Sequence, residues 1–164
     1  LVIPLGVSEQ RPVEERRDVL CYTGDPLTSA LEITGPITVT LYAASSAPDT
    51  DFTAKLVDVR PDGYVQNLAD GIIRARYRES RANPSPITPG MVYEYRLDLW
   101  STSVVLQPGY RLRVEIASAN FPRFDCNPNT GHPLFNDTEL QAATQTIFHD
   151  AARPSHIVLP VISR

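Results

Sequence analysis

The run Ile37-Thr38-Val39-Thr40-Leu41-Tyr42-Ala43-Ala44 shows the pattern that decides the fold of this chain. Every second residue from Ile37 to Ala43 is apolar, and the residues between them are two threonines and a tyrosine. A period of two is typical of a β-strand that buries one face and exposes the other. Gly35-Pro36, directly before the run, is a turn signal. The stretch therefore predicts a strand with one face on a core.

Comparable β-prone runs recur along the chain, separated by short stretches rich in turn-forming residues. We expect strands at residues 19–23, 37–44, 52–59, 64–69, 72–78, 91–99, 104–106, 110–117, 144–149 and 156–161. No long helical pattern interrupts them, and the 15 prolines supply frequent turns. Short, evenly spaced strands predict an all-β fold, an antiparallel two-sheet jelly-roll sandwich. A parallel sheet is excluded because it needs crossover helices.

The length of 164 residues fits one domain, because a chain of this size buries about 70% of the surface that it exposes when unfolded. Residues 1–18 become polar after the first few and contain Pro12. We expect them to lead into the domain, which then spans residues 19–164. The chain begins with leucine rather than methionine, which suggests a segment of a longer protein.

Charge and hydropathy limit the partners of the chain. It has 15 basic and 19 acidic residues, a net charge of −4 and no basic cluster. This balance argues against binding to nucleic acid or to a membrane surface. The longest apolar runs have about five residues, far fewer than the ~20 that span a bilayer, and the first residues lack the features of a signal peptide. We expect a soluble protein, and its compartment stays open.

Two cysteines, Cys21 and Cys126, are too few for a disulfide framework. One bridge between them stays possible if the loop around Cys126 folds back onto the first strand. We expect two separate, buried thiols instead.

Catalytic chemistry is hard to place on this chain. There is no Gly-x-Ser-x-Gly motif and no strand-turn-helix element that would expose a nucleophilic serine. The three histidines, His132, His149 and His156, have no nucleophile near them in sequence, so we expect structural roles for them. We therefore assign no catalytic residue.

Metal and cofactor sites are similarly weak. The cysteines lack the neighbouring ligands that zinc needs, and no glycine-rich loop is present that would hold a nucleotide phosphate. Calcium is the one open alternative, with Asp49 and Asp51 as its best-placed ligands. An Asp-x-Asp before a strand more commonly caps a turn, and this is our expectation. No cofactor is expected.

Three arginines, Arg74, Arg76 and Arg78, share one face of the predicted strand at residues 72–78. An exposed face paired with neighbouring carboxylates is the expected arrangement. A face that binds an anion is the alternative.

The loop Ser118–Gly131 is the strongest candidate for a functional site. It follows the best strand-like run of the chain, residues 110–117, and contains two prolines, three asparagines, two phenylalanines, an arginine and an aspartate. Such a concentration of polar and aromatic side chains suggests a specific contact. Sequence alone leaves open whether that contact is to a substrate, to another domain or to the loop's own sandwich.

Eight segments of the chain, taken together and in order, resemble one known family. They are residues 9–14, 18–23, 31–36, 47–59, 70–78, 120–125, 127–131 and 145–150. The chain resembles the C-terminal domain of the X-Pro dipeptidyl-peptidase and cocaine-esterase-like (CocE/NonD) serine hydrolases. Cys21 and Cys126 depart from the family, which commonly has an aliphatic residue and an arginine at these positions.

The resemblance implies a galactose-binding-like jelly roll that follows an α/β-hydrolase domain. In that family the preceding domain carries the Ser-His-Asp triad, so the resemblance places no catalytic residue here. It also implies that the hydrolase domain is the partner of the loop, which would face that domain or border the substrate cleft. The loop residues expected in this role are Asn120, Phe121, Arg123, Phe124, Asp125, Asn127 and Asn129.

Two other interpretations stay open. The loop could close only its own sandwich, with Phe121 and Phe124 in the core, and direct contact with substrate is the least favoured role. The whole chain could instead be a stand-alone carbohydrate- or ligand-binding module. Such modules stack sugars on exposed aromatic rings, but we expect Trp100, the only tryptophan, to lie in the core.

Overall fold

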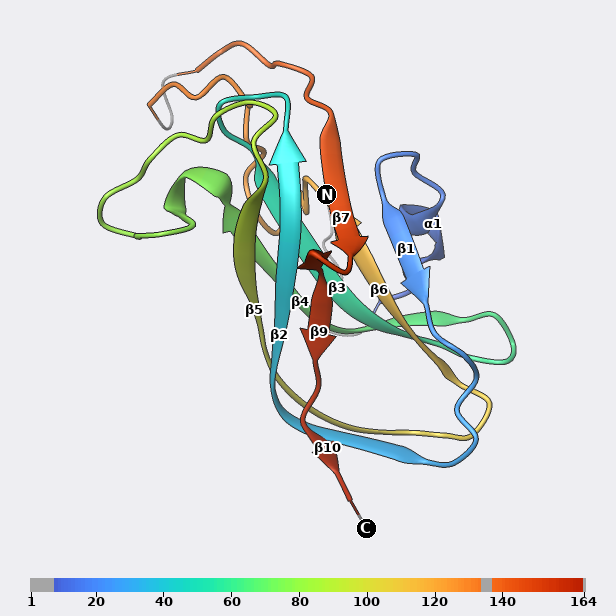
Figure 1. The fold of residues 1–164 in the computed structure, drawn as a ribbon. Helices are drawn as coiled ribbons and strands as arrows, with labels where there is room; N and C mark the ends of the chain where they lie inside the picture. The colour runs from blue at the N-terminus through green and yellow to red at the C-terminus, as the bar shows by residue number, and fades with distance from the viewer. Residues whose placement is uncertain (1–7, 134–136, 164) are drawn as a thin grey trace.

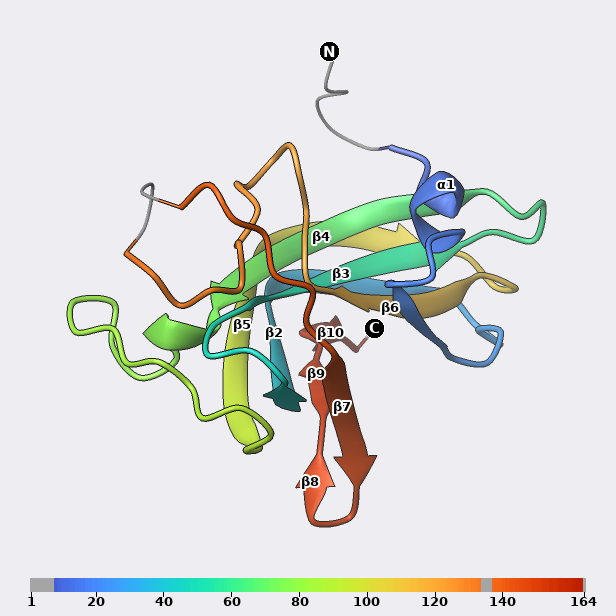
Figure 2. The same cartoon turned by 90° about the horizontal axis from the view of Figure 1, so that it is seen from above.

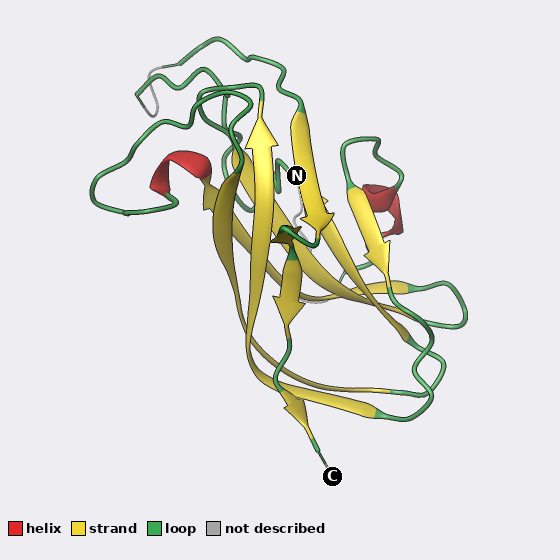
Figure 3. Ribbon diagram, viewed as in Figure 1, coloured by secondary structure: helices red, strands yellow, loops and turns green. Residues whose placement is uncertain are grey.

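The architecture seen in a computed structural model, which describes residues 8–133 and 137–163, is a pair of antiparallel sheets packed as a sandwich (Figures 1 and 2). Strands dominate, and helix is limited in the described residues to a four-residue α-helix and one 3₁₀ turn (Figure 3). The predicted antiparallel two-sheet sandwich is confirmed. The galactose-binding-like assignment stays a prediction.

The two sheets share no strand. Sheet A has the order β1 (Leu20–Thr23), β6 (Arg111–Ala117), β3 (Asp51–Val59) and β4 (Val65–Arg74). Sheet B is built on β2 (Leu31–Ser45), which pairs along one edge with β5 (Tyr93–Leu106) and along the other with β7 (Gln145–Asp150), β9 (His156–Val158) and β10 (Val161–Ile162); β8 (Arg153–Pro154) pairs with β7.

The alternation that opens the sequence analysis belongs to β2, the central strand of sheet B. Ile37, Val39, Leu41 and Ala43 are all buried, as a period of two predicts. The strand is longer than expected and starts at Leu31. The core lies between the sheets, with Phe52 of β3 against Tyr95 of β5 at 4.7 Å between ring centroids.

The strands predicted at residues 64–69 and 72–78 are wrong in their division. They form the single strand β4, which pairs with β3 without a turn at Asp70-Gly71 and ends at Arg74. Ala75–Tyr77 then form the 3₁₀ turn η1. Gly71 serves close packing rather than a turn, because a Cβ there would lie 2.2 Å from the backbone oxygen of Asp98 in β5. Glycine permits this approach of the two sheets.

The runs predicted at residues 91–99 and 104–106 also join, as β5. A register shift opposite Ile37 accommodates one extra residue of β5, and Trp100 there has a positive φ of 64°. The carboxylate of Asp98 accepts a hydrogen bond from the Trp100 backbone N–H at 2.8 Å. Core packing of Trp100 is therefore a wrong prediction: the ring points outward and is 70% exposed.

Both cysteines are free thiols, as expected, but both are exposed, so the prediction of buried thiols is wrong. Cys21 lies in the edge strand β1, in which all four residues are exposed. Cys126 lies in the loop after β6.

The described part of the leading segment packs on sheet A. Gln10 donates its backbone N–H to Val65 of β4, and Asn67 donates to Ser8. The helix α1 (Arg11–Glu14) follows; residues 1–7 of the segment lie outside the described residues. Within residues 8–133 and 137–163, no helix is long and apolar enough to cross a membrane.

A buried acidic residue, Glu115 of β6, lies on the outer face of sheet A. It is 2% exposed, and neither of its carboxylate oxygens has a hydrogen-bond partner among the described residues. Around it are Glu14 of α1, Lys55 of β3, Cys21 of β1 and Arg113, which binds Glu14 at 2.6 Å. Burial raises the pKa of Glu115 to about 7; Lys55 opposes this rise and Glu14 adds to it.

Replacing Gly71 by alanine should destabilise the chain. The added Cβ meets backbone, which can yield only by moving β4 away from β5, so we expect a loss of about 1–3 kcal/mol or more in the free energy of unfolding. Urea denaturation measures it. Gly24→Ala is the matched control, because the nearest atom to its Cβ is 3.6 Å away. Equal stability of the two variants would show that the sheets are not in close contact at Gly71.

Stability should fall as pH rises from about 5 to 8. Folded Glu115 keeps its proton up to a pKa of about 7, whereas an unfolded glutamate loses it near 4.5, so the folded state binds more protons in this interval. Glu115→Gln should flatten the dependence and raise stability at pH 8 by about 1–3 kcal/mol. Urea unfolding at both pH values tests this, with the exposed Glu139→Gln as control; an unchanged slope in Glu115→Gln contradicts the assignment.

Candidate functional site

Two fully buried carboxylates, Asp49 and Asp51, lie at the end of the sandwich where β3 begins. Asp49 accepts hydrogen bonds from Nε of Arg76 at 2.7 Å and from the Arg76 backbone N–H at 2.9 Å. Asp51 accepts a forked pair of bonds from Nε and Nη2 of Arg74, at 2.8 and 3.0 Å. Each buried charge thus has a guanidinium partner, which is the condition under which burial of a carboxylate is tolerated.

The electrostatics of this pair follow from burial and mutual contact. Burial raises the pKa of the Asp51 carboxyl, and hydrogen bonds from Arg74 and Asn127 offset part of that rise. The same contact with Asp51 raises the pKa of the Arg74 guanidinium. The arginine therefore stays charged and holds the carboxylate in place.

The candidate loop is tied to these carboxylates by its own side chains. Nδ2 of Asn127 donates to both Asp49 and Asp51, at 3.0 and 2.9 Å. Asp125 adds an ion pair to Arg74 at 3.1 Å. The loop is therefore fixed to the start of β3 and to the end of β4 at the same point.

The loop is attached to β4 at a second point, Asp70, which precedes Arg74 in the strand. This aspartate is 6% exposed, forms an ion pair with Nη1 of Arg123 at 2.6 Å and accepts a hydrogen bond from Nδ2 of Asn120 at 2.9 Å. The backbone N–H of Phe124 donates to the carbonyl of Asn120 at 3.1 Å, which closes this part of the loop on itself.

Asn129 shapes the end of the loop. It has a positive φ of 64°, and its backbone N–H donates to Oδ1 of Asn127 at 2.9 Å, the turn bond that its residue type favours. Its own side chain donates to the carbonyl of Gln141 at 2.9 Å. The polar side chains predicted for the site thus come together, and all contact their own domain.

The aromatic residues of the loop behave differently. Phe121 is 65% exposed and Phe124 is partly buried, with the guanidinium of Arg123 at 5.5 Å from the centre of its ring. Phe121 is therefore not a core residue. Arg123 keeps about half of its side chain exposed while it binds Asp70.

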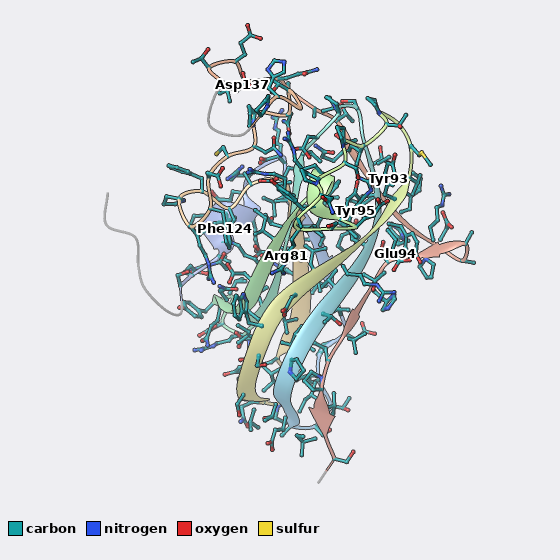
Figure 4. The ribbon with its side chains drawn as sticks, turned by 90° about the vertical axis from the view of Figure 1, so that its left-hand side faces the viewer. Arg81, Tyr93, Glu94, Tyr95, Phe124 and Asp137 are labelled. Carbon is teal, nitrogen blue, oxygen red and sulfur yellow. The ribbon has the colours of Figure 1, made fainter. Side chains whose placement is uncertain are left out.

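A groove of about 660 Å³ runs beside the loop, between it and β5. Phe124 and Arg123 line one side of it, and Arg96 and Trp100 of β5 line another. Arg81 also borders the groove, on the face that carries Phe124 (Figure 4). The exposed indole of Trp100 and the ring of Phe124 thus line one groove, which we call the Trp100 groove.

The arginines predicted on one strand face are paired with carboxylates, as expected, but they are not exposed. Their side chains are only 13%, 12% and 8% exposed for Arg74, Arg76 and Arg78. The 3₁₀ turn after Arg74 takes the other two away from the strand face. Arg78 then lies over the ring of Tyr93, 4.3 Å from its centre, and pairs with Glu79.

The carboxylates of Asp49 and Asp51, the alternative calcium ligands, are engaged by protein side chains. Their oxygens accept hydrogen bonds from Arg74, Arg76 and Asn127, and two guanidinium groups at this distance repel a cation. In the part of the chain that the structure describes, no group of three or more His, Cys, Asp or Glu residues is arranged to hold a metal ion.

The histidines contact other groups than serine. His132 lies 3.1 Å from Asp137, His149 packs edge-on against Tyr22 at 5.8 Å, and His156 is 2.7 Å from the carbonyl of Pro154. Among residues 8–133 and 137–163, no hydrogen bond links a serine hydroxyl to a histidine ring.

Comparison with known proteins adds the family to this geometry. Residues 6–158 match the family described as the X-Pro dipeptidyl-peptidase C-terminal non-catalytic domain. The chain belongs to this family. The resemblance drawn from the sequence is confirmed.

Relatives of this non-catalytic domain are much longer than the chain. Cocaine esterase of Rhodococcus sp. (strain MB1 Bresler) is 48% identical over 161 residues, which are 97% of this chain and 28% of that protein. An aminopeptidase from a marine sediment Thaumarchaeota archaeon has a TM-score of 0.91 and 36% identity, over 96% of this chain and 28% of that one. An α-amino acid ester hydrolase has a TM-score of 0.91 and 37% identity, over 95% and 27%.

Two residues of this family domain's site, Asp70 and Trp100, were missed by sequence reasoning. Asp70 lies between the two strands predicted at residues 64–69 and 72–78, and Trp100 follows an alternating run, so the sequence predicts a core position for it. A signal for Trp100 does exist: strict alternation from Leu97 and Leu99 places it on the outer face.

Asn127→Ala should destabilise the domain, because two buried carboxylates then lose a shared donor. We expect a loss of about 1–3 kcal/mol in the free energy of unfolding. Asn83→Ala, in an exposed loop, should change it by less than about 0.5 kcal/mol. Urea denaturation of both variants compares them; an Asn127→Ala variant as stable as Asn83→Ala would mean that the loop is not held by Asp49 and Asp51.

Proposed function

We propose that this chain is the C-terminal domain of a serine hydrolase that cleaves esters, amides or X-Pro peptides. In this proposal it packs on the α/β-hydrolase domain and helps to shape the substrate cleft. Residues 1–18 lead from that domain, and residues 19–164 form the sandwich. Support comes from the non-catalytic family, from the share of about 28% of the relatives' length, and from relatives named as esterases and as an aminopeptidase.

The observation that carries this proposal is that the polar and the aromatic side chains of the loop point in different directions. Its polar side chains bind inward, to Asp49, Asp51 and Asp70, while Phe121 points outward with 65% exposure. A loop held by buried charges loses little further freedom on binding, which favours docking. Exposed aromatic residues are the side chains that most often anchor an interface.

The Trp100 groove is a second surface that the loop borders, through Arg123 and Phe124. A non-glycine residue with a positive φ carries backbone strain of about 1–3 kcal/mol, which persists only where the surroundings impose it. Here that strain holds a large apolar ring in solvent, at the border of the groove that Arg123 and Phe124 line. We infer that Trp100 faces the hydrolase domain together with the loop.

A stand-alone ligand-binding module is the second candidate, and the exposure of Trp100 favours it. An exposed indole beside Arg96 and Arg81 has the composition of a site for an acidic sugar. Because Trp100 is the only tryptophan, its fluorescence reports binding directly. A saturable change with acidic or neutral oligosaccharides supports this candidate; no change supports docking.

Phe121→Asp tests the docking surface. In the full-length hydrolase the added charge should weaken the contact between domains, with a fall of about fivefold or more in activity after mild heating. In the 164-residue chain the same change should alter stability by less than about 0.5 kcal/mol, because the ring is mostly exposed. Val105→Asp, at an apolar position 46% exposed on β5, is the control. If both variants inactivate alike, the loop is not the docking surface.

A further inference from the structure

The distance between the two sheets of the sandwich varies from one side to the other. They approach closely where β4 meets β5, at Gly71 and Asp98. On the opposite side they diverge, so that β7 and β9 point away from β1 and β6 (Figure 2). On that side of the angle between the sheets, Leu20 of β1 and Ile147 of β7 line the same cavity.

Two adjoining cavities occupy this angle, of about 440 and 210 Å³. Ile116 of β6 and Ile147 of β7 line both of them. The larger cavity reaches the buried ring of Phe52, and the smaller one reaches Leu41 of β2. Core side chains therefore line an open cleft, which we call the wedge.

The strand β1 is the clearest sign that something is missing from the wedge. Leu20 pairs with Ile116 and Tyr22 pairs with Val114, and residues directly opposite in an antiparallel pair point to the same face. Ile116 and Val114 belong to the core side of sheet A. Leu20 and Tyr22 thus have inward positions, yet they are 44% and 40% exposed, although Tyr22 packs edge-on against His149 of β7.

We propose that the wedge holds a segment of the same polypeptide that precedes residue 1, and that this segment completes the sandwich between β1 and β7. The family name places this domain at the C-terminal end of its protein, and the chain covers only 28% of cocaine esterase, so most of a protein of that length would precede the domain. This inference rests on the proposed function because it requires that the chain be part of a longer protein.

The backbone at the wedge suits an extended occupant. Among the residues that the structure describes, β1 is the last strand in the order of sheet A, and β7 pairs beyond β2 only with the two-residue strand β8. Both therefore present free edges, which can pair with an added strand. Apolar side chains at alternate positions of that strand would cover Leu20, Tyr22 and Ile116. We therefore assign an extended, alternately apolar segment to the wedge.

A cysteine at position 22 tests the proposal in the full-length protein. Tyr22→Cys is made with Cys21→Ser and Cys126→Ser, and its reaction rate with a maleimide is measured. We expect it to react at least tenfold more slowly than Val105→Cys in the same background, although the two positions are 40% and 46% exposed in this structure. Leu20→Cys repeats the test if Tyr22→Cys does not fold. Equal rates overturn the proposal.

A photo-crosslinking residue at position 22 then identifies the occupant. A crosslink to a peptide upstream of residue 1 in the same chain supports the proposal, and a crosslink between two chains overturns it in favour of a second copy. The result is independent of Phe121, which lines neither cavity of the wedge. If position 22 is protected from the maleimide but Phe121→Asp does not lower the activity, the wedge proposal holds and the proposal that the loop docks on the hydrolase domain fails.

Discussion

The buried contact of Asp49 and Asp51 with Arg74, Arg76 and Asn127 is the constraint on which the functional end of this domain depends. A carboxylate without water is tolerated only where charged and polar partners replace its hydration. Here the partners come from three places in the chain: the end of β4, the 3₁₀ turn after it and the loop after β6. Folding to satisfy the two carboxylates therefore brings these three segments together in one arrangement.

That arrangement explains why the loop can present an apolar surface. The network uses the polar groups of Asn127 and Asp125, and Asp70 uses those of Arg123 and Asn120. Phe121 stays outward and 65% exposed, while Phe124 and Arg123 border the groove of Trp100. A surface that is apolar and already held in place loses less entropy on docking than a free loop would.

Much of the fold could be predicted from the sequence because alternation is a local property. The period of two from Ile37 to Ala43 identified β2 without any knowledge of its partners. The errors arose where a residue serves a distant contact: the predicted break between the strands at residues 64–69 and 72–78 contains Gly71, which is a glycine because the backbone of Asp98 lies against it. The loop was predicted as the site from its composition alone. The contacts that attach the loop to the sandwich could not be predicted, because Asn127 and Asp49 are 78 positions apart and no local sequence pattern links the two segments.

The two surfaces of the domain differ in a way that bears on its role. At the loop end, charges are buried and paired, which fixes geometry at some cost in desolvation. At the wedge, Leu20 and Tyr22 remain partly exposed in inward positions, so part of the hydrophobic stabilisation available from them is not used. An independent sandwich gains by closing such an angle, whereas a domain within a larger protein gains by leaving it for another segment to fill. The fixed loop and the open wedge therefore have one explanation: other parts of the same protein complete this fold.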